Sequence, residues 1–334
     1  KQINRYIQVI KPDMDDGKIC DNIHGICVEE CNNEIDLLNK WYQLIVDKNP
    51  DIITGYNIFG FDYEYIYNRY NHIKSNKYYK EKYATYNLES FNLSRNAKNN
   101  NKFTLDKSYV PNTTDSTYNQ SKWFKMDGRI TFDIQKEINS NHNLESYKLD
   151  FVASHFIKGI IKTTTRFNKN KKDILFIEEY DTETNQLDIY WLIETINIGC
   201  LKVNDYISFN IHSIGGEVLL LNGHKFKVDS INKKYNEIRI SIRNININKL
   251  YNELEQYSNC KIEWCLNKDD ISAKDIFYKH KHGGSEGRAL IAKYCIQDCE
   301  LCINLLNLLD IVPNNIGMAN VCKVPLSYIF LRGK

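Results

Sequence analysis

The sequence carries almost no net charge and contains no long hydrophobic run. Its 44 Lys and Arg residues are balanced by 42 Asp and Glu residues, which leaves a net charge of +2 at pH 7. A chain with this balance is not a polycation that coats nucleic acid non-specifically, so any such binding depends on local basic patches, of which the run 166–172 is one candidate. No stretch approaches the ~18 uninterrupted apolar residues of a membrane span, and no secretory signal precedes the first predicted strand. We therefore expect an intracellular protein with no membrane partner.

The ten cysteines do not form the pattern of a disulfide framework. Three of them, Cys295, Cys299 and Cys302, lie on one predicted helix, which is typical of reduced, buried thiols in a chain without a secretory signal. One Cys/His cluster deserves testing as a zinc site, and its members are Cys20, His24, Cys27 and Cys31. Because their spacing matches no standard zinc finger, we favour loop and strand cysteines at these positions.

A chain of 334 residues with 42% hydrophobic residues is long enough for about two domains with cores of their own. The pattern predicts a strand over 3–10, a helix over 35–46, a strand over 51–56 and a helix from about Asp62 to Tyr70. A helix that leads into an apolar strand and then into another helix is typical of α/β packing. The functional site of such a fold is expected at the carboxyl end of the strand.

The remaining segments differ in character. Residues 74–122 are polar and predict a surface excursion or a partly disordered loop. A strand ends at Asp133, and a helix is predicted over 144–157. Alternating strands separated by Asn and Gly turns predict a small antiparallel β module over 174–262. A long helical pattern begins at Ser285, Pro313 closes it, and a short helix begins near Asn315.

Two carboxylates occupy positions where a solvent-facing acid is not expected. Asp62 follows the strand 51–56 at the start of a helix, where the helix dipole and free amides favour a carboxylate. Asp298 lies four residues after Tyr294 on an otherwise apolar helix face, so it points inward. A buried carboxylate needs a cation, a hydrogen-bond network or a metal. Each acid alone also has an ordinary explanation, namely a helix N-terminal acid for Asp62 and an arginine pair with Arg288 or Arg332 for Asp298.

Taken together, the two motifs are more specific. Asn57-Ile-Phe-Gly-Phe61-Asp62 after an apolar strand, and Tyr294-Cys-Ile-Gln-Asp298 within an apolar helix, resemble the second and third exonuclease motifs of family B DNA polymerases. Further matching stretches are Asn49-Pro-Asp-Ile-Ile-Thr-Gly-Tyr-Asn57, Gly128-Arg-Ile-Thr-Phe-Asp133, Glu145-Ser-Tyr-Lys-Leu149 and Val324-Pro-Leu-Ser-Tyr-Ile-Phe-Leu-Arg-Gly333. Within the family the sequence looks most like the delta-type enzymes of large DNA viruses, including relatives of mimivirus.

This resemblance implies an RNase H-like 3′–5′ proofreading exonuclease in a DNA-directed DNA polymerase. It implies the exonuclease domain over 1–173 and 263–312, with the β module over 174–262 inserted and 313–334 leading toward the polymerase palm. Asp62 and Asp298 would bind Mg²⁺, two ions in the intact site, and Tyr294 would position the attacking water. Asn57 and Phe61 would bind the single-stranded primer end. Asp133 is not one of the family's metal ligands, and we assign it to structure.

The resemblance also extends to partners and location, namely DNA, a sliding-clamp processivity factor, and a virus factory or nucleus where viral DNA is replicated. The sequence departs from the family pattern in one respect, because the Asp-x-Glu of the first exonuclease motif does not precede Ile3. Asp181-Thr-Glu183 has that spelling but lies in a turn of the β module, and no palm motif is recognisable. Two other hypotheses stay open: a stand-alone 3′–5′ exonuclease, and a non-catalytic module that binds single strands through its tyrosines.

Overall fold

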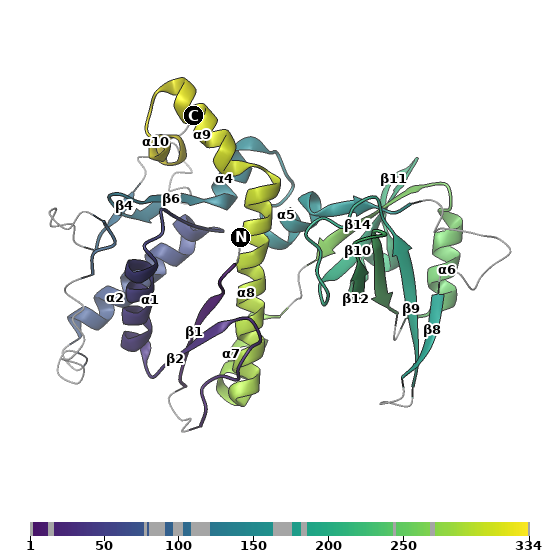
Figure 1. Ribbon diagram of the computed structural model, residues 1–334, viewed down its shortest axis with the longest axis horizontal. Coiled ribbons are helices and arrows are strands. Elements are labelled where there is room, and N and C mark those ends of the chain that lie inside the picture. The colour runs from purple at the N-terminus through teal and green to yellow at the C-terminus, as the bar shows by residue number, and fades with distance from the viewer. Residues whose placement is uncertain are drawn as a thin grey trace. The chain divides into compact units, whose positions relative to one another are not determined.

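The chain folds into two compact units, which are described separately. The computed structural model describes residues 3–12, 17–76, 79, 91–95, 103–107, 121–162, 176–181, 186–242, 245–267 and 271–332. Unit 1 comprises Lys1–Glu145 and Ile271–Lys334, and unit 2 comprises Ser146–Asp270 (Figure 1). The basic run 166–172 lies outside the described residues.

Unit 1 is built from parallel strand pairs and helices, which confirms the predicted α/β class. β1 (Tyr6–Ile10) pairs in parallel with β2 (Cys27–Cys31), and β3 (Ile52–Gly55) pairs in parallel with β6 (Ile130–Asp133). An antiparallel pair is formed by β4 (Leu105–Lys107) and β5 (Lys122–Phe124). The helical segments are α1 (Glu34–Lys48), a π-helical turn (Ile58–Asp62), α2 (Tyr63–Ser75), α4 (Ile134–Asn141), α7 (Ala273–His282), α8 (Gly284–Leu308), α9 (Ile311–Cys322) and α10 (Leu326–Arg332).

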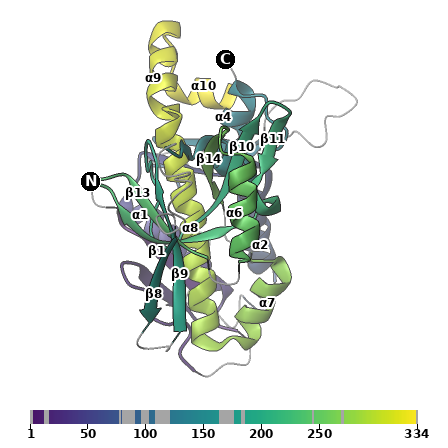
Figure 2. The ribbon, with the colours of Figure 1, turned by 90° about the vertical axis from the view of Figure 1, so that its right-hand side faces the viewer.

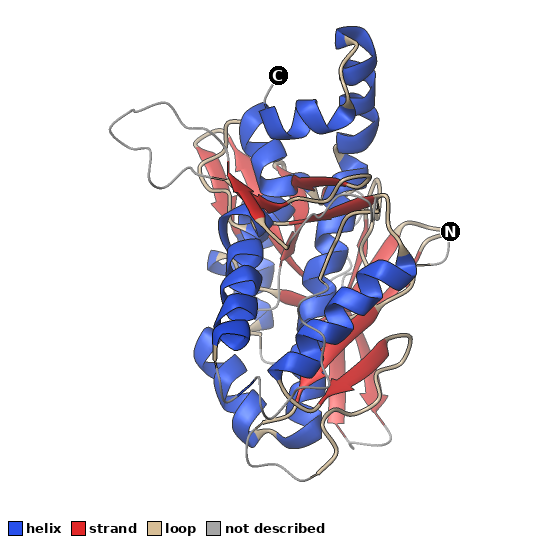
Figure 3. Cartoon of the chain, turned by 90° about the vertical axis from the view of Figure 1, so that its left-hand side faces the viewer, coloured by secondary structure: helices blue, strands red, loops and turns tan. Residues whose placement is uncertain are grey.

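Helices lie beside these parallel strands. α1 contacts β1 and β2, and α8 also contacts β1. Figure 3 shows the side of unit 1 that contains α1 and α2. The pairing of β3 with β6 and the contact of α8 with β1 thus join segments that are far apart in the sequence. This agrees with the α/β packing that the helix–strand–helix pattern predicts. No helix in the described part of the chain is long and apolar enough to cross a membrane.

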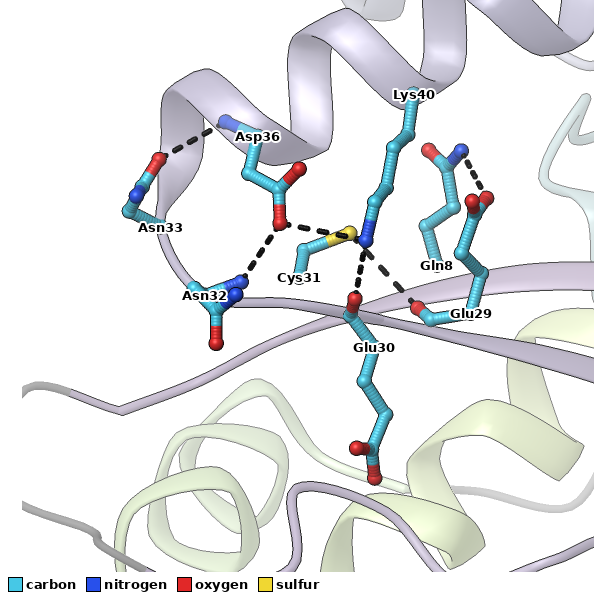
Figure 4. Close-up of polar contacts among 8 residues, drawn as sticks. All are labelled: Gln8, Glu29, Glu30, Cys31, Asn32, Asn33, Asp36 and Lys40. Carbon is cyan, nitrogen blue, oxygen red and sulfur yellow. Dashed lines mark hydrogen bonds and ion pairs between the residues drawn. The ribbon is translucent and has the colours of Figure 1, made fainter. Parts of the chain in front are cut away.

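The start of α1 is held by a network of side chains. Asn33 is the N-cap, and its Oδ1 accepts a hydrogen bond of 2.9 Å from the backbone N–H of Asp36. The carboxylate of Asp36 accepts a 3.0 Å bond from the N–H of Asn32 and lies 3.3 Å from Nζ of Lys40, which also donates to the carbonyl of Glu30 on β2 (Figure 4). These contacts satisfy amides that the first helical turn leaves without partners and fix α1 to the end of β2.

The polar segment 74–122 is not only a surface excursion, so this part of the sequence interpretation is wrong. Its described residues include Phe91, Leu93 and Phe103, each no more than 8% exposed. Phe91 stacks on Tyr42 with 4.3 Å between ring centroids, and Phe103 stacks on Phe124 at 4.5 Å. A few aromatic anchors thus attach a largely polar segment to the core, because each buried ring contributes a large apolar area.

The helical pattern near the C-terminus ends earlier than predicted. α8 stops at Leu308, and Asp310 adopts a left-handed conformation with φ 47° that separates it from α9. Pro313 therefore does not close α8 but lies in the first turn of α9. That position tolerates proline because its missing N–H would have no partner within the helix.

Unit 2 is an antiparallel β structure. Its strand order is β7 (Lys158–Ile160), β14 (Lys261–Asn267), β10 (Tyr206–Ser213), β12 (Phe226–Asn232), β13 (Glu237–Ser241), β9 (Gln186–Glu194) and β8 (Phe176–Asp181), and β11 (Gly216–Leu219) pairs with β10. The sheet curls until Ile161, after β7, forms a bridge with Thr195, after β9. The strands from β7 to β9 thus form a small barrel.

Large side chains fill the inside of this barrel. They include Trp191, Phe209, Phe226 and Trp264, all at most 3% exposed. The indole N–H of Trp264 donates a 2.9 Å hydrogen bond to the hydroxyl of Thr195. A Cβ at Gly159 would lie 2.5 Å from that indole nitrogen, so only glycine fits there. Two helices, α5 (Leu149–Phe156; Figure 1) and α6 (Ile247–Gln256; Figure 2), complete the unit.

The compact unit is wider than the β module expected over 174–262. The β7 strand pairs with β14, and α5 contacts β14, so residues from Ser146 onward belong to unit 2. The three-residue strand β7 leaves no periodic pattern in the sequence. The helix predicted over 144–157 corresponds to α5, but its pattern does not indicate that it packs with the β module.

Candidate functional site

The loop that follows β3 is held by a buried aspartate at the end of β6. Asp133 is 3% exposed, and its carboxylate accepts hydrogen bonds from the backbone N–H of Asn57, Phe59 and Gln135 at 2.9, 2.9 and 3.0 Å. Burial raises the pKa of Asp133, although these backbone hydrogen bonds act in the opposite direction. Asp133 therefore has a structural role, as expected: its carboxylate anchors the loop that carries the second motif.

Asn57 turns the chain at this anchor. Its backbone is left-handed with φ 60°, a conformation that asparagine tolerates better than most residues. Its carbonyl accepts hydrogen bonds of 3.1 Å from the N–H of Gly60 and of Phe61. A Cβ at Gly60 would lie 2.4 Å from Oδ1 of Asn57, so the motif's glycine makes room for the asparagine side chain. Asn57 is exposed at this turn.

Asp62 directly precedes α2, near the helix N-terminus as predicted, but another helical turn comes before it. The π-helical turn Ile58–Asp62 continues into α2, and the N–H of Tyr63 already bonds to the carbonyl of Ile58. Asp62 makes no capping hydrogen bond. Although the residue as a whole is exposed, partial desolvation of its carboxyl group raises the pKa of Asp62, a hydrogen bond from its own backbone N–H lowers it, and the charge of Asp133 adds a smaller increase. The helix dipole thus does not dominate here.

Phe61 projects an exposed ring beside this acid. Its side chain is 61% exposed, and its ring is stacked on that of Tyr65, with 5.8 Å between centroids and 12° between planes. A large exposed aromatic pair is unusual for simple core packing and suits contact with a flat ligand. Phe61 is therefore not a core residue.

Tyr294 and Asp298 lie one turn apart on α8, as predicted. Asp298 is half-buried and its Oδ1 atom is shielded from solvent. The arginines considered as its partners make other contacts. Arg288 donates to the carbonyl oxygens of Lys18, Ile19 and His280, and Arg332 lies over the ring of Tyr328.

The pKa values of two cysteine thiols on α8 are raised by acids from separate segments of the chain. Burial raises the pKa of the Cys299 thiol, and the charges of Asp298, Glu300 and Asp62 raise it further. Burial also raises the pKa of Cys302 to about 12, with contributions from Cys299, Asp298 and Asp133. Asp62 thus acts on Cys299, Asp133 acts on Cys302, and Asp298 acts on both thiols. Asp62 and Asp298 therefore both lie within electrostatic range of Cys299.

Within the described part of the chain, no three His, Cys, Asp or Glu side chains gather closely enough to hold a metal ion. This statement includes Cys20, His24, Cys27 and Cys31, of which Cys20 and Cys31 are buried. All ten cysteines are described, and none forms a disulfide. Of the Asp181-Thr-Glu183 sequence, only Asp181, at the end of β8, lies in the described residues.

Sequence reasoning missed two features of this site. It did not predict that Asp133 holds the loop of Asn57, and it did not predict that Cys299 and Cys302 lie among the acids. The first had a sequence signal, because an aspartate two residues before Gln135 at a strand-to-helix step is a typical N-cap. The second had none beyond the helical spacing of the cysteines.

Comparison with known proteins identifies the first part of the chain. Residues 7–152 match the model of the DNA polymerase family B exonuclease domain. These residues are similar to that family. The matched region contains Asn57, Phe61, Asp62 and Asp133, so it includes the loop after β3.

Relatives extend the similarity to nearly the whole chain. The DNA polymerase of Pyramimonas orientalis virus is 36% identical over 315 residues, which cover 94% of this chain and 21% of the relative. The DNA polymerase of Acanthamoeba polyphaga mimivirus is 29% identical over 95% of this chain and 22% of its own length. The DNA polymerase delta catalytic subunit of Arabidopsis thaliana is 33% identical over 42% of this chain and 11% of its own length. The chain thus spans about a fifth of the length of these viral relatives.

The viral alignments must include most of unit 2, because only a few per cent of this chain lies outside them. The exonuclease domain model, in contrast, ends at residue 152, shortly after unit 2 begins at Ser146. Unit 2 is therefore a part that this chain shares with viral DNA polymerases and that the matched domain model does not describe.

Proposed function

We propose that this chain forms part of the 3′–5′ proofreading exonuclease of a family B DNA polymerase that acts in viral DNA replication. The family match over 7–152 and the viral relatives support this proposal. In this proposal unit 1 has the RNase H-like fold of the exonuclease, and unit 2 is the inserted β module. The segment 313–334 leads toward the polymerase palm.

The observation that carries the proposal is that two acids from separate segments lie within electrostatic range of one residue of α8. Asp62 from the loop after β3 and Asp298 from α8 both act on the thiol of Cys299, although 236 positions separate them in the sequence. Phosphodiester hydrolysis by divalent ions requires carboxylates gathered from distant segments. This arrangement provides two of them.

The residues at this place suit Mg²⁺. Carboxylate oxygens are the ligands this ion prefers, and a cation bound between the two acids would reduce the repulsion between their negative charges. A bound Mg²⁺ polarises the phosphoryl oxygens and lowers the pKa of a coordinated water. Asp62 and Asp298 would hold the ions, whereas the Asp-x-Glu of the family's first exonuclease motif is not recognised before Ile3, and Asp181-Thr-Glu183 belongs to unit 2.

The neighbouring residues have positioning roles in this proposal. Tyr294, one turn before Asp298, directs the attacking water through its hydroxyl group. Phe61 and its partner Tyr65 offer an exposed aromatic surface on which a frayed terminal base can stack, and Asn57 at the adjacent turn contacts the strand. The partners of the whole protein are then DNA with a single-stranded primer 3′ end and a sliding clamp. Its location is a virus factory or the nucleus.

The test uses the intact polymerase with Asp62→Ala or Asp298→Ala. Each substitution should lower excision of a mismatched primer terminus by more than about 100-fold, since even ligand-supporting residues contribute 10- to 100-fold. Extension of a matched primer should stay at the wild-type rate. Asp47→Ala, which removes an exposed carboxylate of α1, is the matched control and should leave both rates unchanged. Near wild-type excision by either active-site variant would show that the acids are assigned incorrectly.

A further inference from the structure

Unit 2 contains a groove that is lined by aromatic and charged side chains, unlike the apolar inside of its barrel. The groove has a volume of about 370 Å³ and lies on the outer face of the sheet. This volume is within the roughly 300–1,000 Å³ of pockets that take small organic groups. Its lining combines aromatic and basic side chains with one carboxylate. These residues include Tyr190, Tyr206, His224, Lys225, Lys227 and Asp229.

The strand register places the central side chains of this groove in one row. Tyr206 on β10 is paired with Lys227 on β12, and Ser241 on β13 is paired with Tyr190 on β9. The pairing of Val228 with Ile240 sets Lys227 beside Ser241 across β12 and β13. Because neighbouring residues point to opposite faces of a strand, the row lies on the face opposite the buried apolar residues. Two tyrosines thus flank a lysine across four adjacent strands, roughly 14 Å from end to end.

The charges of the groove favour an anion. Lys227 is exposed and forms no ion pair with any residue that the structure describes. Lys225 adds a second positive charge to the lining. The single carboxylate among the lining residues, Asp229, lies 3.2 Å from Arg239, and the two lysines outnumber it.

One of the two tyrosines is fixed in place before any ligand binds. The guanidinium carbon of Arg239 lies 3.6 Å from the ring centroid of Tyr190. Arg239 is held in turn by a two-pronged ion pair with Glu179 at 2.7 and 2.6 Å. An aromatic ring that is already ordered loses little side-chain entropy when a flat partner stacks on it.

From these observations we propose that unit 2 binds single-stranded nucleic acid along the row of Tyr206, Lys227 and Tyr190. Phosphates would contact Lys227 and Lys225, and bases would stack on the two tyrosine rings. Alternating aromatic and basic side chains on an open β surface are the combination that binds single strands with little sequence preference. This site is separate from the proposed exonuclease site, since all its residues belong to unit 2.

The experiment measures binding of a fluorescent 20-nucleotide oligo(dT) to the complete 334-residue chain by fluorescence anisotropy, in EDTA and at low salt. Lys227→Glu should weaken binding on the order of tenfold and make the salt dependence shallower, by about 0.7 in the log–log slope for each phosphate that the variant no longer neutralises. Tyr206→Ala should weaken it about fivefold or more. Lys249→Glu, the same charge change at an exposed position on α6 outside the groove, is the control and should bind like wild type. Thermal melting checks that each variant is folded.

Further ligands test the two parts of the proposal. An abasic oligonucleotide of equal length should bind more weakly than oligo(dT), and duplex DNA more weakly than a single strand. Ultraviolet crosslinking of a 5-iodouracil oligonucleotide should label peptides that contain Tyr190 or Tyr206. Equal binding of the abasic strand would overturn the stacking role.

Other outcomes would overturn the whole site. These are equal affinities of Lys227→Glu and Lys249→Glu, crosslinks confined to unit 1, or no binding of oligo(dT) at all. Asp62→Ala and Phe61→Ala separate this site from the exonuclease proposal. If binding disappears in those variants but persists in Lys227→Glu, the groove is rejected and the exonuclease site still stands. If binding persists in those variants and disappears in Lys227→Glu, the groove is supported, whatever the excision assay shows.

Discussion

Replacing Asp133 should both destabilise unit 1 and release the loop of the proposed exonuclease site. Oδ1 of Asp133 accepts from the N–H groups of Asn57 and Gln135, and Oδ2 accepts from the N–H of Phe59. Asp133→Ala removes both oxygens at a position that is only 3% exposed, so little water can take their place. The three amides then lose their acceptors together.

The magnitude follows from these three bonds. A buried donor that loses its acceptor costs about 1–3 kcal/mol, and the raised pKa shows that burial already offsets part of what the ionised carboxyl contributes. We therefore expect Asp133→Ala to lower the free energy of unfolding by about 3–5 kcal/mol. Asp133→Asn keeps an oxygen for Asn57 and Gln135 but turns an NH₂ group toward the N–H of Phe59. Its cost should be about 1–3 kcal/mol.

Denaturant-dependent hydrogen exchange, read by mass spectrometry, suits this chain because two units need not unfold together. Peptides from α2 and β6 report the opening of unit 1, and the peptide spanning Asn57–Phe59 reports the loop. Asp47→Ala, on the exposed face of α1, should stay within about 0.5 kcal/mol of wild type. The reasoning would be refuted if Asp133→Ala matched that control, or if Asp133→Asn were the more damaging of the two.

Three further predictions concern other parts of the chain. Asn33→Ala should destabilise α1 by about 1 kcal/mol while Asn33→Asp costs little, as seen by denaturant melts; equal losses would contradict the capping role. Although burial raises the pKa of Glu263, hydrogen bonds from Lys261, His212 and Lys158 outweigh that effect and lower the pKa to about 2. The ionised Glu263 therefore stabilises unit 2 by roughly 3 kcal/mol above pH 4.5, and this stabilisation is lost as the pH falls toward 2. Glu263→Gln should flatten this part of the stability–pH curve, and an unchanged curve would contradict the role of Glu263. The 334-residue chain alone should digest a labelled single strand with Mg²⁺ far more slowly than an intact polymerase, since it lacks the Asp-x-Glu pair; digestion at the intact enzyme's rate would contradict this.

The helices and strands of unit 1 with strong periodicity were predictable from the sequence. The patterns over 35–46 and 51–56 correspond to α1 and β3, and the pattern from Ser285 corresponds to α8. Their apolar residues recur at the spacing of a helix or form a continuous apolar run, and both patterns can be read from the order of residues within one segment. The motif residues were also found from such elements, because Asn57, Phe61 and Asp62 follow β3, and Tyr294 and Asp298 lie one turn apart within α8.

Long-range contacts decided the rest. No local pattern indicates that Phe91 and Phe103 anchor a polar segment, that β7 pairs with β14, or that a π-helical turn precedes α2. The pKa of Asp62 depends on burial by distant segments and on Asp133, which is 71 positions away. The groove of unit 2 depends on register, which sets Tyr206, Lys227 and Tyr190 side by side across separate strands.

The sequence by itself determined the kind of elements, their order, and which acids and aromatics the chain offers, because these follow from spacing along a single segment. Only the tertiary structure decided which of these groups meet, how far each is withdrawn from water, and where the two units begin and end. The physical reason is that strand pairing and burial join residues far apart in the chain, and the energy of a charged group is set by these neighbours rather than by its neighbours in sequence.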